Sequence, residues 1–315
     1  MTDVSSPLLE RAASADAFSP PRAAEARVGK ITSSDMSRWI APALTAATFA
    51  WLFWRPAVSL AREWWENPDA GHGLLLFPVA IWLAWRAGRH PDARPQLAAG
   101  LLILGLAVLL RYVSSLAAEV FTMRASMLLA VVGLTVAHGG FRQVWHWWLP
   151  FVVAGLSIPL PTLVTSAISL PLQFKASELG ASLLRMRNVP VMLDGNVIRL
   201  PGHQLFVAEA CSGLRSLTAL LALGVLLGGL MLRSPISRLL LLALAIPVAI
   251  AINGVRVFLT GFLVLFVDPK LAEGFTHVTE GWLLFMVSLS ALGALAWLCR
   301  RAERLVPRWR DGAAA

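Results

Sequence analysis

The feature that most constrains this chain is a series of long apolar runs separated by short polar segments. Stretches such as LLILGLAVLL (101–110) and LLALAIPVAIAI (241–252) carry no charged residue. One helical crossing of a bilayer needs about 20 mostly apolar residues. Only 14% of all residues are charged, against about 25% in soluble domains. The pattern predicts an all-α polytopic membrane protein.

We predict about eight transmembrane helices, with no internal repeat. Residues 1–37 are polar, lack the apolar core of a signal peptide, and are interpreted as a disordered cytoplasmic tail. Residues 300–315 form a basic cytoplasmic tail, and the membrane domain covers residues 38–299. The predicted spans are 38–55, 73–86, 97–117, 121–138, 145–163, 210–232, 239–267 and 278–299.

The distribution of Lys and Arg fixes the expected orientation. Most basic residues fall in segments that face the cytoplasm if the N-terminus is inside, as the positive-inside rule requires. Both termini are then cytoplasmic. The net charge of +9 does not indicate nucleic-acid binding, because the basic residues lie in short loops between apolar runs.

The long outer segment before the sixth span carries two expected elements. Over 162–187, the apolar residues Leu163, Ile168, Leu172, Leu179 and Leu183 stand among Ser, Lys, Glu and Arg. This pattern favours an amphipathic helix lying at the membrane interface. Asp194-Gly195 stands between two apolar runs, which is typical of a small β-hairpin.

The stretch EACSGLRS (209–216) holds the first candidate for chemistry, at the outer start of the sixth span. Arg215 follows Cys211 by one helical turn, and Glu209 precedes it. A nearby cation and a helix N-terminus both favour the thiolate, which is the nucleophilic form. The alternative is a buried thiol that serves only as a small hydrophobe. Cys299 ends the last span on the opposite side, so we expect no disulfide between the two.

Arg256 is the second candidate, because it lies well inside the seventh span. An intramembrane arginine costs several kcal/mol unless it is paired or faces water, so it is a functional candidate by default. Asn253 shares its helical face and could hold the guanidinium. The alternative is a structural ion pair with Glu209 or Glu280.

Two histidines begin spans on the same outer side as Cys211. His277 begins the eighth span and His72 the second. Imidazole exchanges protons near neutral pH, and the residues alone do not rank the two. A cysteine, a histidine and an arginine at the outer ends of different spans suit acyl transfer through a thioester. Whether Arg215 or Arg256 stabilises the oxyanion stays open. Nothing in the sequence requires a metal or an organic cofactor.

Three motifs resemble those of the exosortase/archaeosortase family of membrane cysteine enzymes. VAEACSGLRSL (207–217) is similar to the nucleophile motif, INGVRV (252–257) to the arginine motif and FTHVTEGW (275–282) to the histidine motif. The resemblance covers most of residues 60–285. It implies that Cys211, Arg256 and His277 are the catalytic residues.

The resemblance also implies a function. The expected enzyme is a cysteine transpeptidase of the bacterial inner membrane, with its active site facing the periplasm. It would cut the C-terminal sorting signal of PEP-CTERM-type proteins and transfer them to a lipid or glycan acceptor at the membrane surface. A separate exopolysaccharide-system protein is a possible partner. The alternatives are an intramembrane cysteine protease that releases its product to water, and a non-enzymatic component of exopolysaccharide export.

Overall fold

The computed structural model describes residues 33–67, 69–207, 214–268 and 274–305, and at the beginnings of α1, α7 and α9 it describes mainly the backbone. The chain divides into two compact units, Met1–Leu52 and Phe53–Ala315. Within the first unit, the described residues are the first part of α1. All further contacts reported below lie within the second unit.

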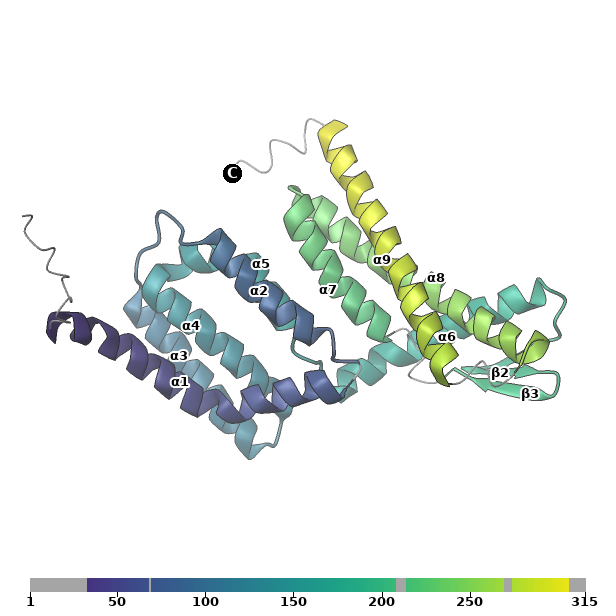
Figure 1. Cartoon of the computed structure of the whole chain (residues 1–315), viewed down its shortest axis with the longest axis horizontal. Helices are drawn as coiled ribbons and strands as arrows, with labels where there is room; N and C mark the ends of the chain where they lie inside the picture. Colours follow the sequence, from purple (N-terminus) through teal and green to yellow (C-terminus); the bar gives the residue numbers. More distant parts are fainter. Residues whose placement is uncertain (1–32, 68, 208–213, 269–273, 306–315) are drawn as a thin grey trace, which may run out of the picture. The chain divides into compact units, whose positions relative to one another are not determined.

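The described part of the chain contains nine helices and three short strands; Figure 1 labels the helices and the strands β2 and β3. The helices are α1 (Ser33–Glu66), α2 (Gly73–Ala87), α3 (Leu97–Leu116), α4 (Val120–His146), α5 (Trp148–Leu156), α6 (Thr162–Arg185), α7 (Leu214–Met231), α8 (Pro235–Phe266) and α9 (Gly274–Leu305). The strands are β1 (Met192–Asp194), β2 (Val197–Leu200) and β3 (His203–Phe206).

The chain is a multi-pass membrane protein. Among the described residues, α3, α4, α8 and the Gly281–Leu305 part of α9 are long and apolar enough to cross a bilayer. The α2 helix and residues Leu217–Met231 of α7 are shorter apolar helices. Large apolar side chains cover the outside of these helices, as on α3, where Leu102 is 77% exposed. Such a surface suits lipid rather than water.

The prediction of eight similar spans is correct only in part. Residues 38–55 lie within the longer helix α1, which continues to Glu66. The predicted span 145–163 is wrong as a single helix. The α4 helix ends at His146, α5 has nine residues, and the chain breaks again before α6. Nine residues give a helix of about 13 Å. Pro159 and Pro161 follow α5 and prevent it from continuing.

The helix expected over 162–187 is present as α6, but its packing differs from the expectation. Apart from Leu184, its buried face is formed by small and polar residues, whereas Leu163 is 81% exposed. This face packs against α8. A Cβ on Gly180 would lie 2.5 Å from Val257, and one on Gly254 would lie 2.4 Å from Leu179. These glycines therefore permit the close approach of the two helices.

The predicted hairpin is part of a three-stranded antiparallel sheet with the order β1-β2-β3. Asp194 pairs with Val197, so the two-residue turn is Gly195-Asn196, one residue later than the expected pair. Gly195 has φ +60°, a conformation that glycine adopts without strain. Ile198 and Val207 are buried together with residues of α6 and α8, which holds the sheet against these helices.

The helices that carry the candidate motifs form one packed group. The α7, α8 and α9 helices contact one another in pairs (Figure 1). Leu220, Leu241 and Leu292, one from each helix, are fully buried in a common core. This core packs together α7, which follows Cys211, and α8 and α9, which carry Arg256 and His277.

Candidate functional site

Arg256 lies on α8, in the part of the helix that packs against α6 and α9. Its side chain is half-buried. Asn253, three residues earlier, is only 5% exposed. The hydroxyl of Thr260 donates to the carbonyl oxygen of Arg256 at 3.0 Å.

The guanidinium of Arg256 lies against α9 at Gly281. A Cβ built on Gly281 would stand 3.3 Å from Nη2 and 3.6 Å from Cζ of Arg256. His277 occupies the position one helical turn before Gly281 on the same helix, a rise of about 6 Å. The fold thus brings the Arg256 cation within about one turn of the backbone that carries the candidate histidine.

This arrangement has a clear chemical capacity. A guanidinium is always charged and presents several N–H donors. Partly removed from water, it can stabilise negative charge that develops on an oxygen beside α9.

The remaining predicted residues of the first motif lie largely outside the described part of the chain. Glu209 and Cys211 are not among the described residues, and of Arg215 only the helical backbone is described. The α7 helix begins at Leu214, three residues after Cys211 in the sequence. The side chain of His277 is also outside the description. The roles of these residues stay predictions.

His72 lies at the start of α2 and lines a cavity of about 330 Å³. Its Nδ1 is 3.1 Å from the carbonyl oxygen of Asp69, a hydrogen-bond distance. Burial lowers the pKa of His72, against the opposing effects of the Leu156 and Asp69 carbonyls. The neutral imidazole therefore predominates near neutral pH. Thr218 of α7 lines the same cavity, so His72 faces a space that reaches the early part of α7.

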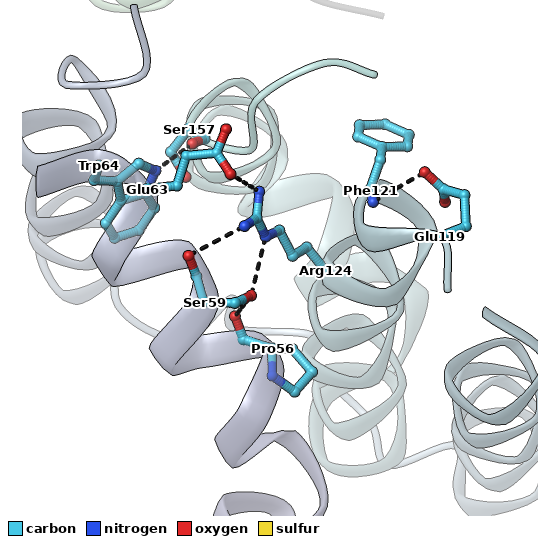
Figure 2. Close-up of polar contacts among 8 residues, drawn as sticks. All are labelled: Pro56, Ser59, Glu63, Trp64, Glu119, Phe121, Arg124 and Ser157. Atoms are coloured by element: carbon cyan, nitrogen blue, oxygen red, sulfur yellow. Dashed lines mark hydrogen bonds and ion pairs between the residues drawn. The ribbon is translucent and has the colours of Figure 1, made fainter. Parts of the chain in front are cut away.

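A buried ion pair beside this cavity was not anticipated from the sequence. Figure 2 shows Arg124 of α4 directed toward Ser59 and Glu63 at the end of α1. The guanidinium lies 2.8 Å from the Glu63 carboxylate and donates to the carbonyl oxygen of Ser59 at 3.1 Å. Arg124 is 4% exposed. Arg124 lies within the predicted span 121–138, so the sequence could have identified it by the same reasoning that identifies Arg256.

The tryptophan next to Glu63 fixes the wall of the cavity. Trp64 donates from Nε1 to the carbonyl oxygen of Ser157 at 2.7 Å, as Figure 2 also shows. A Cβ on Gly73 would lie 2.1 Å from the Trp64 ring, so only glycine fits at the start of α2. These contacts tie the end of α1 to α2 and to the connection between α5 and α6.

A row of hydroxyl side chains on α6 was also missed. Thr162, Thr165, Ser166 and Ser169 line the cavity. Their spacing of i, i+3, i+4 and i+7 places them on one helical face. This spacing of hydroxyl residues can be recognised in the sequence in the same way as the spacing of apolar residues along one face of a helix.

No group of three or more His, Cys, Asp or Glu side chains with a metal-binding arrangement occurs among the described residues.

A comparison with protein families matches residues 64–294 to the model of the transmembrane exosortase family (Exosortase_EpsH). The match covers well over half of the chain and includes all three motifs. The chain belongs to the transmembrane exosortase family. No curated protein and no solved structure matched the chain. The expected family is thus confirmed.

Proposed function

We propose that this exosortase-family protein is a cysteine transpeptidase. It cleaves the C-terminal sorting signal of PEP-CTERM-type proteins and transfers the new carboxyl group to an acceptor at the membrane surface. The proposal is supported by family membership. The observation that carries it is the position of the Arg256 guanidinium against Gly281, one turn after His277.

The proposed reaction begins with the thiolate of Cys211. The sulfur attacks the carbonyl carbon of the scissile peptide bond, and Arg256 stabilises the oxyanion that forms. His277 gives a proton to the leaving amine as the C–N bond breaks, which leaves a thioester on Cys211. The acceptor then attacks the thioester, loses a proton to a base, and releases the thiolate. In this scheme Arg215, Glu209 and Asn253 position the reacting groups.

The proposed location is the bacterial inner membrane, with both termini in the cytoplasm and the site on the periplasmic side. The basic residues in the predicted cytoplasmic segments support this orientation. A substrate anchored by its own helix would then present its cleavage motif on the side of Cys211.

The test is co-expression with a tagged PEP-CTERM substrate, followed by the intact mass of the substrate's new C-terminus. We expect shortening with an added mass in wild type and in Cys299→Ala, and an intact substrate in Cys211→Ala. Cys299 is the matched control, because it is the chain's other cysteine and is buried in α9. Shortening without added mass would identify a protease. Equal processing by Cys211→Ala would refute the cysteine mechanism.

A further inference from the structure

The cavity beside His72 has the character of a binding site for a small polar molecule. Its volume of about 330 Å³ is at the lower end of the ~300–1000 Å³ typical of ligand pockets. Carboxylates of Glu63 and Asp69 and the hydroxyl row of α6 line it. Within the described part of the chain, no lysine, arginine, phenylalanine, tyrosine or tryptophan lines it. The described lining therefore disfavours an anion and offers none of the large rings on which a sugar usually stacks.

The orientation of the Glu63 carboxylate is fixed by a residue that does not line the cavity. Arg124, which does not line the cavity, holds it at 2.8 Å, and Ser59 receives two further hydrogen bonds from the same guanidinium (Figure 2). The side chain of Glu63 remains one-third exposed. Arg124 thus fixes a carboxylate that presents hydrogen-bond acceptors to the cavity.

Ser169 supplies a second, independent indication of a ligand. It is 4% exposed, lines the cavity, and accepts a hydrogen bond from Gln173 at 3.1 Å. Among the described residues, no acceptor receives its hydroxyl hydrogen. A buried donor of this kind is costly unless a partner occupies the adjacent space. An occupant that offers an acceptor to Ser169 as well as donors to the carboxylates would satisfy these groups.

We infer that this cavity binds the acceptor of the transfer reaction and that the acceptor is a small amine-bearing polar group, such as an amino alcohol. The ammonium hydrogens suit Glu63 and Asp69, and an oxygen of the same group suits Ser169. The inference rests on the proposed function for its catalytic part, whereas the binding part stands on the cavity alone.

The chemistry of the transfer then follows. The bound ammonium gives one proton to the neutral imidazole of His72, and the amine nitrogen attacks the thioester carbonyl. A C–N bond forms, the C–S bond breaks, and the thiolate of Cys211 leaves. The second proton lost by the nitrogen passes to water. Burial lowers the pKa of His72, so the imidazole is in its neutral form before the transfer.

The binding test uses Cys211→Ala protein in detergent and saturation-transfer NMR with ethanolamine as the probe. We expect ethanolamine to bind and ethylene glycol, which lacks the amine, to bind at least tenfold more weakly. Asp69→Asn should weaken ethanolamine binding by a similar factor. Asp194→Asn is the matched control, because that carboxylate is exposed and pairs with Arg199 outside the cavity. Equal binding of the two probes, or unchanged binding by Asp69→Asn, would overturn the inference.

The transfer test adds ethanolamine to wild-type protein and a sorting-signal substrate, with the product mass as readout. We expect the ethanolamine mass on the new C-terminus, and a shift toward the free carboxyl in Asp69→Asn. Cleavage that yields only the free carboxyl at saturating ethanolamine would refute the inference and leave the cysteine mechanism intact. Absence of Cys211-dependent cleavage would instead contradict the proposed function.

The source of the amine is distinguished by vesicles. In phosphatidylethanolamine vesicles without free amine, a product that carries the lipid mass identifies a headgroup acceptor. In phosphatidylcholine vesicles, a product formed only with added ethanolamine identifies a soluble amine. Products without amine in both vesicles, with ethanolamine present, would contradict the proposed acceptor class.

Discussion

The Arg124–Glu63 pair gives a prediction whose size follows from the structure. Glu63→Gln keeps the shape of the side chain but leaves the buried Arg124 cation without its carboxylate. Arginine cannot release its proton to escape the cost. Breaking a buried pair costs about 3–5 kcal/mol. Because two hydrogen bonds to Ser59 remain, we expect a loss of about 3 kcal/mol in the free energy of unfolding.

Removing the arginine of the pair should lower the free energy of unfolding by less. Arg124→Met fills the buried space with an apolar side chain and leaves Glu63, which is one-third exposed beside the cavity. Water can hydrate this carboxylate, so we expect a loss of about 1–2 kcal/mol. Arg62→Gln is the control, since its pair with Glu66 spans 3.8 Å and both side chains are about two-thirds exposed. It should change stability by less than about 0.5 kcal/mol.

The assay is equilibrium unfolding of the purified variants in mixed micelles with increasing denaturing detergent. The predicted order of destabilisation is Glu63→Gln, then Arg124→Met, then Arg62→Gln. If Arg124→Met were the most destabilising, or if Glu63→Gln behaved like the control, an unpaired Arg124 would not cost more than an unpaired Glu63, and the reasoning from burial would be refuted.

Two further predictions concern the site. Gly281→Ala should lower the rate of substrate cleavage by roughly three- to tenfold, because a Cβ 3.3 Å from Nη2 displaces the Arg256 guanidinium by a few tenths of an ångström. The control Gly293→Ala, on the same helix, meets open space and should leave the rate unchanged. Equal rates for both variants would argue against a catalytic Arg256. The pKa of His72 is lowered from 6.5 on folding. The unfolded chain therefore binds more protons than the folded chain as the pH falls below about 6.5, and the free energy of unfolding should decrease there. His72→Gln should flatten this pH dependence, and an unchanged profile in that variant would exclude His72 as its source.

Much of the fold could be predicted from the sequence, because long apolar runs leave few alternatives to a helix. Four of the predicted spans correspond to long apolar helices and two to shorter ones. The span 145–163 failed because hydropathy averages over a backbone break. The α4 helix ends at His146, and α5 ends at Leu156, before Pro159. Hydropathy carries no information on either backbone feature.

The site could be predicted less completely, because a motif names residue types without their neighbours. The position of Arg256 inside a span is visible in the sequence, but its contact with Gly281 depends on how α8 and α9 pack. The same holds for Arg124 and Glu63, which are 61 residues apart in the sequence and meet only in the fold. His72 was identified by its place at the start of a span, whereas the cavity that it faces required the packing of α6 and α7.

The most direct test of the account is the mass of the enzyme itself during turnover. Wild-type protein, incubated with a sorting-signal peptide and quenched in acid, should carry the mass of the acyl fragment on the peptide that contains Cys211. Hydroxylamine should release this adduct, as expected for a thioester. His277→Ala should alter its accumulation, Cys299→Ala should retain it, and Cys211→Ala should abolish it together with cleavage. Cleavage that continues in Cys211→Ala without any adduct would contradict the central claim.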